Sequence, residues 1–223
     1  MFGVKKRRPR LRVEVGGVAY GLEEVSGDSW AAFSFGDGFV AILISDGMGT
    51  GSHAAEQSRM VAESLRTMLL VGYDVESSLQ KVNQLMLRSQ HQDGYATLDL
   101  MVIHRLSGQA KLFKMGASVT FLLRNQRVFT ASGRNLPVGI STQKDLHSTD
   151  LEVKKGDVLV MVSDGVTNCD RDDPECRWLK QELRKAQTTD PVALADLICK
   201  KAMEKYGERE RDDITAMVAI VDD

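Results

Sequence analysis

The sequence predicts an α+β fold in which two antiparallel sheets stack face to face, each with helices on its outer side. Strands joined by hairpin signals are segregated from helices along the chain, in the order strands, helix pair, strands, helix pair, strand. Two predicted strands, residues 39–44 and 158–162, are apolar without interruption, which is typical of strands buried on both faces. Two stacked sheets with helices on their outer sides would bury both faces of these two strands.

The first third of the chain changes from a strand pattern to a helix pattern. Apolar and polar residues alternate in 12–15 and 30–35, and Gly36-Asp37-Gly38 is a hairpin signal before the apolar strand 39–44. Apolar residues then recur every three or four positions, which predicts helices over 52–70 and 75–88. We therefore expect hairpins followed by a helix pair.

The rest of the chain returns to strands and then to helices. Ser107-Gly108 and Asn125 are turn signals between predicted strands, and Asp190 before Pro191 marks a helix start. The expected elements are strands 96–106, 109–115, 120–124, 126–130 and 158–162, helices 175–186 and 191–206, and a last strand 214–221.

Composition excludes several classes of protein. The 223 residues, 43% hydrophobic and 27% charged, fit one soluble globular domain, and no apolar run approaches the roughly 20 residues of a membrane helix. The cysteines Cys169, Cys176 and Cys199 contain no C-x-x-C pair, so they indicate neither a disulfide framework nor a zinc site. We expect a cytoplasmic location and no transmembrane segment in this chain.

The N-terminal segment is strongly basic. Residues 1–12 contain six of the 29 Lys and Arg, which leaves 23 basic against 31 acidic residues in the body and argues against a nucleic-acid-binding surface. We interpret residues 1–12 as a basic linker or boundary segment and residues 13–223 as the folded domain. A partner or lipid contact of the basic segment remains an alternative.

Acidic residues recur where predicted strands begin or end. Carboxylates gathered at the rim of a sheet repel one another unless cations compensate them, and Mg²⁺ and Mn²⁺ prefer oxygen ligands. One Ser-Asp-Gly alone is typical of a turn or cap, but its repetition after two buried strands favours a shared metal site. The residues are Asp28, Asp46, Asp164 and the pair Asp212-Asp213.

A glycine follows two of these aspartates. Gly47 and Gly165 are expected to let the backbone turn sharply and approach a bound ion, so the Gly47 carbonyl is itself a candidate metal ligand.

These residues resemble the metal-dependent protein phosphatases, the protein phosphatase 2C (PPM) family, and most closely its bacterial branch typified by the phosphatase domain of stage II sporulation protein E. The matching motifs occur in the family's order over residues 26–215: Ser26-Gly27-Asp28, Ile44-Ser45-Asp46-Gly47-Met48-Gly49, Val162-Ser163-Asp164-Gly165 and Arg211-Asp212-Asp213-Ile214-Thr215. The resemblance implies an αββα sandwich of the PPM type, covering residues 13–223.

The resemblance also implies roles for single residues. Asp46 would bridge two manganese or magnesium ions, the Gly47 carbonyl would bind one of them, and Asp164 with Asp212 would bind the other. Asp28 would hold water at the metals, so Asp28, Asp46 and Asp164 are the candidate catalytic residues; Asp213 remains an alternative to Asp212. The family's phosphate-binding arginine has no evident counterpart, and its long flap is shortened to about residues 168–174.

The implied activity is hydrolysis of phosphoserine on a small regulatory protein of the anti-anti-sigma factor type, by a metal-activated water, in control of sporulation sigma factors. The chain would then be the cytoplasmic portion of a membrane-anchored parent. The alternative is a catalytically weak or regulated binding or scaffold relative. The main alternative enzyme, a haloacid dehalogenase type of phosphatase, is disfavoured because the Asp-x-Asp motif that it carries at the first strand is absent there, and trapping of an aspartyl phosphate would be needed to revive it.

The predicted helix 52–70 invites a regulatory hypothesis. Because it follows Gly47 directly, its movement would alter metal binding, and it is a candidate switch, homodimer contact or docking face. The other interpretation is that its Met and Leu stripe is core. His53, at the start of this helix, is either a general acid or a helix-start and solvent neighbour.

Overall fold

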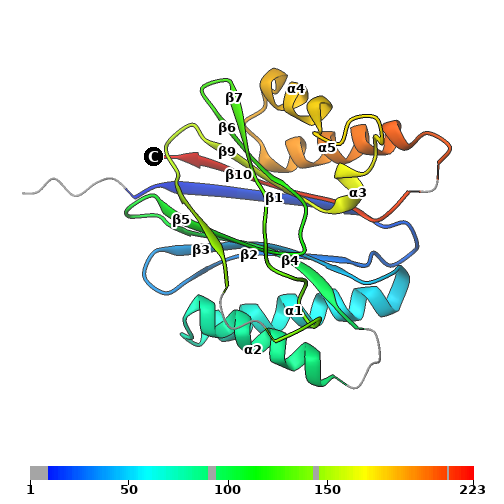
Figure 1. Cartoon of the computed structure of the whole chain (residues 1–223). Coiled ribbons are helices and arrows are strands. Elements are labelled where there is room, and N and C mark those ends of the chain that lie inside the picture. The colour runs from blue at the N-terminus through cyan, green and yellow to red at the C-terminus, as the bar shows by residue number, and fades with distance from the viewer. Residues whose placement is uncertain (1–9, 90–93, 143–145, 210) are drawn as a thin grey trace, which may run out of the picture.

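The computed structural model describes residues 10–89, 94–142, 146–209 and 211–223. They form two five-stranded sheets in which every strand pair is antiparallel. The sheets stack face to face with helices outside (Figure 1). The predicted αββα sandwich is confirmed. The basic stretch 1–9 lies outside the described residues, so its role as a linker stays a prediction.

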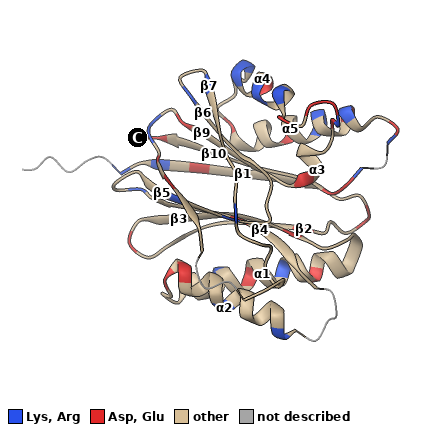
Figure 2. Cartoon of the chain, in the orientation of Figure 1, with Lys and Arg blue, Asp and Glu red and all other residues tan. Residues whose placement is uncertain are grey.

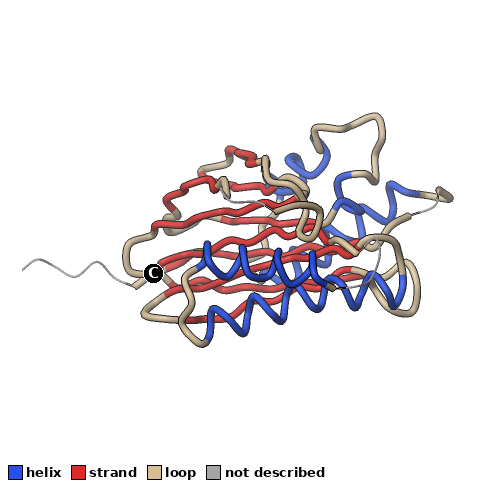
Figure 3. Tube along the Cα trace, turned by 60° about the horizontal axis from the view of Figure 1, so that its bottom comes forward, coloured by secondary structure: helices blue, strands red, loops and turns tan. Residues whose placement is uncertain are grey.

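One sheet, called sheet B, carries the first helix pair. Helix α1 (Gly51–Leu70) packs on its first two strands and α2 (Val75–Arg88) packs beside α1, as Figure 3 shows from the helix side. Asp74 caps α2 by accepting a hydrogen bond from Ser77 N. The strands of sheet B are, in spatial order, β2 (Asp28–Phe35), β3 (Phe39–Gly47), β4 (Ala96–His104), β5 (Gln109–Met115) and β8 (Ser148–Glu152).

The second sheet, sheet A, carries the C-terminal helices. Helix α5 (Pro191–Tyr206) packs across its first two strands, and Asp190 caps this helix through Val192 N and Ala193 N, as the sequence predicts. The short α3 (Asp164–Thr167) and α4 (Arg177–Lys185) complete the layer. In spatial order the strands are β1 (Arg12–Tyr20), β10 (Ile214–Asp222), β9 (Val158–Val162), β6 (Thr120–Arg124) and β7 (Arg127–Ala131).

The uninterrupted apolar runs fill two cores at once. On β3, Val40, Ile42 and Ile44 face the core between the sheets, whereas Ala41 and Leu43 face the core under α1 and α2. Successive side chains of a strand point to opposite faces, so a strand covered on both sides needs apolar residues at every position. This confirms the reason for predicting two stacked sheets.

Some elements differ from the sequence prediction. Strand β8 was not predicted, because it is an edge strand with one apolar residue in Ser-Thr-Asp-Leu-Glu. Helix α4 starts at Arg177 rather than residue 175 because Cys176 has a left-handed backbone, with φ 50°. Strand β1 continues through Gly16, where a Cβ would lie 2.5 Å from Val192 N of α5.

None of the helices within the described ranges is both long enough and apolar enough to span a membrane.

An ion pair is buried between the two sheets. Lys114 of β5 and Asp99 of β4 are directly opposite each other and form an ion pair, and both side chains are 2% exposed. Thr120 of β6 accepts from Lys114 Nζ at 2.7 Å and donates to Asp99 Oδ2 at 2.8 Å, so the pair also joins the sheets. Removing one partner of such a pair leaves an uncompensated buried charge.

We predict that Lys114→Met lowers the free energy of unfolding by about 3–5 kcal/mol, measured by urea denaturation. The matched control is Lys111→Met on the same strand, whose surface ion pair with Glu76 is half exposed. That control should cost no more than about 1 kcal/mol. The double variant Lys114→Met/Asp99→Leu should recover most of the loss. Equal costs for the two lysines would contradict the prediction.

Candidate functional site

The acidic residues singled out in the sequence lie at one end of the sandwich, where the core between the sheets stops. On β3 the face formed by Val40, Ile42 and Ile44 continues to Asp46, and Asp28 of β2 lies directly opposite Asp46. Asp164 is the first residue of α3, just after β9. In Figure 2, acidic segments of α3 and of the loop before β10 lie at this same end.

The electrostatics show that the five carboxyl groups act on one another. Burial and then repulsion raise the pKa of Asp46 to about 9; the repelling carboxylates are Asp28, Asp164, Asp212 and Asp213. Burial and the Asp212 carboxylate likewise raise the pKa of Asp164. The structure therefore brings all of the predicted acidic residues together.

Asp28 is the most unusual of these side chains. It is 7% exposed, and neither carboxylate oxygen has a hydrogen-bond partner among the described residues. Burial raises the pKa of Asp28 to about 7, although the hydroxyls of Thr215 and Ser163 act in the opposite direction. Because leaving a buried carboxylate without partners is costly, its position is suited to a ligand from outside the polypeptide.

The pair Asp212-Asp213 divides into two different environments. Asp213 is 3% exposed, and its two oxygens accept hydrogen bonds from Leu22 N and Gly27 N, each at 2.6 Å. It therefore holds the loop between β1 and β2. Asp212 is half-buried, accepts a hydrogen bond from Asp213 N at 2.8 Å, and lines a cleft.

The two glycines that follow the aspartates are required by close packing. A Cβ on Gly47 would lie 2.0 Å from the Ala54 carbonyl oxygen of α1, and a Cβ on Gly165 would lie 2.0 Å from the Asp213 carbonyl oxygen. Neither glycine has a positive φ. Neither position therefore needs the left-handed backbone that favours glycine: each glycine lets two distant segments touch beside an aspartate.

Sequence reasoning missed the hydroxyl groups of the same motifs. Ser45 Oγ donates to Thr97 O at 2.8 Å, and Thr97 Oγ1 accepts from Asp46 N at 3.3 Å. On the other sheet, Ser163 Oγ accepts from Thr215 N at 2.9 Å. The serine of each Ser-Asp-Gly thus ties the end of its strand to the next strand. Its repetition in the sequence was the available signal.

The arrangement of donors fits a hard divalent cation. A cavity of about 30 Å³ is lined by Asp46, Asp164 and Thr97, and this is room for one ion or water molecule. Carboxylate, hydroxyl and carbonyl oxygens are the ligands that magnesium and manganese prefer. Over the described ranges, no three His, Cys, Asp or Glu side chains already converge on one point. The carboxylates are therefore close enough to repel one another, but their oxygens are not arranged around a single metal-ion position.

His53 does not join this group. It is exposed on α1, and its Nδ1 is hydrogen-bonded to Gln57 Nε2 at 3.0 Å. Gln57 Oε1 in turn accepts from Met48 N at 3.0 Å. His53 thus supports the turn from β3 into α1; it is exposed, as a solvent neighbour would be, and the N-cap of α1 is Thr50.

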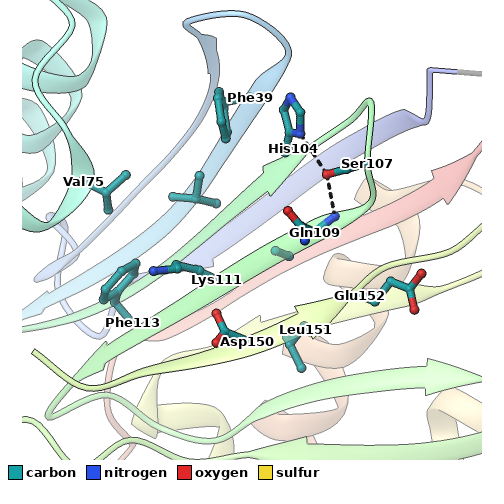
Figure 4. A pocket seen from close by; sticks show the side chains of 12 residues that line it. Phe39, Val75, His104, Ser107, Gln109, Lys111, Phe113, Asp150, Leu151 and Glu152 are labelled. Atoms are coloured by element: carbon teal, nitrogen blue, oxygen red, sulfur yellow. Dashed lines mark hydrogen bonds between the residues drawn. The ribbon is translucent and has the colours of Figure 1, made fainter. Parts of the chain in front are cut away.

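Another cavity, of about 740 Å³, lies on the outer face of sheet B (Figure 4). Its lining includes Phe39, Phe113 and Leu151. Lys111 of β5 and Asp150 of β8, which are paired on adjacent strands, also line it. None of the predicted site residues lines it. It therefore has no counterpart to the cluster of aspartates and is not the candidate active site.

Comparisons with known proteins match the chain to one family. The family model for stage II sporulation protein E (SpoIIE) matches residues 36–222. The stage II sporulation protein E of Bacillus subtilis is 30% identical over 199 residues, which is 89% of this chain and 24% of that protein. A more distant relative, the phosphoserine phosphatase RsbU of Bacillus subtilis, is 23% identical over 159 residues, 70% of this chain and 47% of that protein.

A solved structure extends the match to the fold. The structure of the PP2C phosphatase domain and a fragment of the regulatory domain of SpoIIE from Bacillus subtilis superposes with a TM-score of 0.88 at 29% identity. The match covers 96% of this chain and 64% of that chain. Metal dependence is a general property of PP2C phosphatases. With its acidic cluster at the end of an αββα sandwich, this chain belongs to the SpoIIE family and is a PP2C-type phosphatase domain.

Proposed function

We propose that the chain hydrolyses phosphoserine on a phosphorylated regulatory protein with the help of two divalent metal ions, manganese or magnesium. The observation that carries the proposal is the group of mutually repelling carboxylates at the same end of the sandwich as Asp46, whose pKa is raised to about 9. Such a cluster is compensated by cations of high charge. The similarity to the phosphoserine phosphatase RsbU supports phosphoserine as the substrate group.

The proposed metal ligands are Asp46, the Gly47 carbonyl, Asp164 and Asp212. Asp213 is the weaker candidate, because both of its oxygens are occupied by backbone N–H groups. Its proposed role is to fix the loop that ends in Gly27, next to Asp28. When bound, the ions would lower the pKa of water and neutralise charge on the phosphoryl oxygens.

Asp28 is proposed to position the attacking water. Its two unpartnered oxygens are free to accept hydrogen bonds, and it lies opposite Asp46 on the neighbouring strand. Thr97 Oγ1 accepts from Asp46 N and thereby fixes the end of β3. In this proposal the nucleophile is water and no protein side chain attacks the phosphate. The three cysteines, Cys169, Cys176 and Cys199, are buried.

The finer biological role is also a proposal. The chain spans about a quarter of the length of the curated SpoIIE it matches, so the parent's activity and partners extend beyond what the domain can establish. We assign it to the cytoplasmic part of a membrane-anchored parent that dephosphorylates an anti-anti-sigma factor and controls sporulation sigma factors. The alternative is a catalytically weak binding or scaffold relative, which manganese-dependent phosphate release would exclude.

Helix α1 is proposed as the regulatory element and as a homodimer contact. Gly47 is pressed against Ala54 of α1, and Met48 N bonds Gln57, so a shift of α1 would move the end of β3. The apolar stripe of α1, including Val61, Leu65 and Leu69, is core. A contact with another chain would therefore use its exposed end near Leu70 and Val71, which are 51% and 68% exposed.

The test of the proposed function is Asp46→Asn. It should lower manganese-dependent hydrolysis of both p-nitrophenyl phosphate and a phosphoserine peptide more than about 100-fold, because even partners of metal ligands cost 10–100-fold. Manganese should also no longer raise the melting temperature of the variant. Asp150→Asn, an exposed acid on β8, is the control and should change neither. Wild-type turnover in Asp46→Asn would overturn the proposal.

Asp212→Asn and Asp213→Asn should fail in different ways. Asp213→Asn should lower the stability of the chelator-treated protein by about 1–3 kcal/mol, because the Leu22 and Gly27 N–H groups lose a charged acceptor. Asp212→Asn should not lower that stability, because it removes a charge that repels Asp46 and Asp164, and it should weaken manganese binding, measured by calorimetric titration. The reverse pattern would assign the metal-binding role to Asp213.

The chelator-treated protein should lose stability as pH rises from about 4 to about 9. The pKa values of Asp28 and Asp46 in the folded state, about 7 and about 9, lie above the ordinary value of 3.8, so the folded protein binds more protons in this window. Urea denaturation at about pH 5 and about pH 8 measures the difference. Manganese should restore stability at the higher pH; metal-free stability that rises with pH would contradict the account.

A further inference from the structure

A second cleft adjoins the acidic cluster and is lined by arginines. It has a volume of about 640 Å³ and lies between the loop after α3, the end of α5 with Arg209, Arg211 and Asp212, and the segment before α1. Asp212 is one of its lining residues, so the cleft is continuous with the proposed metal site. Its arginines are Arg171, Arg209 and Arg211.

Two of these arginines are fixed by neutral groups. Arg209 donates to the carbonyl oxygens of Cys169, Lys205 and Tyr206, and its guanidinium lies 5.4 Å from the centre of the Tyr206 ring. Arg211 donates to Gly21 O at 3.2 Å and contacts Met203 Sδ at 3.1 Å. Carbonyl oxygens and a thioether carry no net charge, and neither guanidinium forms an ion pair with a carboxylate that the structure describes, although Asp212 lines the same cleft.

Arg171 is held differently. It is exposed and forms no hydrogen bond or ion pair with any residue that the structure describes. The neighbouring Asp170 does not compensate it, because that carboxylate pairs with Lys205 at 2.9 Å. The cleft therefore presents one exposed arginine without a partner among the described residues and two fixed ones, in a chain whose formal net charge is −2. Such a wall attracts anions, and arginine matches the planar geometry of a carboxylate.

The size of the cleft points to a peptide. Pockets of about 300–1,000 Å³ hold molecules much larger than one phosphate group. A phosphoserine whose phosphate lies at the aspartate cluster would direct the neighbouring residues of its chain into this cleft, since Asp212 belongs to both. The ligand best matched to the arginines is then an acidic side chain close to the phosphoserine.

We propose that this cleft docks an acidic segment next to the phosphoserine of the protein substrate, with Arg171 as the residue that selects for acid. The inference rests on the proposed function for the location of the phosphoserine. Arg209 and Arg211 supply the positive field, and Arg171 is free to close on a carboxylate. The cleft thus determines which phosphoproteins bind, separately from the metals that act on phosphate.

The test is a binding measurement that needs no catalysis. Two fluorescent serine peptides differ only in whether Asp and Glu, or Asn and Gln, flank the serine, and fluorescence anisotropy reports their affinities for the whole chain. Wild type should bind the acidic peptide about 3–10-fold more tightly, and Arg171→Ala should remove most of that difference. Arg171→Lys should restore part of it. Arg184→Ala, an exposed arginine on α4 outside the cleft, should keep the full preference.

Hydrolysis provides a second reading. For the phosphorylated acidic peptide, Arg171→Ala should raise KM by a similar factor. Equal affinity of wild type for the two peptides, or an unchanged preference in Arg171→Ala, overturns the docking proposal even if manganese-dependent turnover is intact. Acidic-peptide preference without any turnover would support docking and refute the proposed phosphatase activity. Preferential binding to phosphatidylserine vesicles with no peptide preference would assign the arginines to a membrane surface and overturn the proposal.

Discussion

The repulsion among five carboxyl groups at one end of the sandwich is the constraint around which the rest of the site is organised. The core between the sheets could have ended in apolar residues, yet the face of β3 that begins with Val40 ends in Asp46. Low local dielectric strengthens the repulsion, as the raised pKa values of Asp28 and Asp46 indicate. Without metal, protons relieve this repulsion; in the proposed function, divalent cations would take their place and serve phosphoryl transfer.

The polypeptide holds the carboxylates in place with neutral contacts. Ser45 and Ser163 tie their strand ends to neighbouring strands by hydrogen bonds. Gly47 and Gly165 let another backbone segment approach so closely that a Cβ atom would not fit. The carboxylate of Asp213 accepts hydrogen bonds from two backbone N–H groups of the β1–β2 loop. Hydrogen bonds and close backbone contacts therefore set the positions of these strand ends, and the contact between Gly47 and Ala54 of α1 underlies the proposed regulatory role of that helix.

The sequence was sufficient to predict the elements and residues whose signals are local. The uninterrupted apolar run of β3 predicts that its side chains fill the cores on both faces of the sheet. The hairpin at Gly36-Asp37-Gly38 pairs β2 with β3, which places Asp28 beside Asp46. The edge strand β8 was missed because one leucine in five residues carries no periodicity. Asp99 and Lys114 were missed although each interrupts an apolar strand. Their meaning depends on being paired across the sheet, which no local pattern reveals. The arginine cleft was missed for the same reason, because it is formed by residues far apart in the sequence: Arg209 donates a hydrogen bond to the carbonyl oxygen of Cys169.

The most direct test of the central claim is anomalous diffraction from crystals soaked in manganese chloride. Two anomalous peaks within bonding distance of the carboxylate oxygens of Asp46, with Asp164 and Asp212 on one of them, are predicted. No peak in this cluster, or manganese bound only at some other place on the surface, would contradict the account.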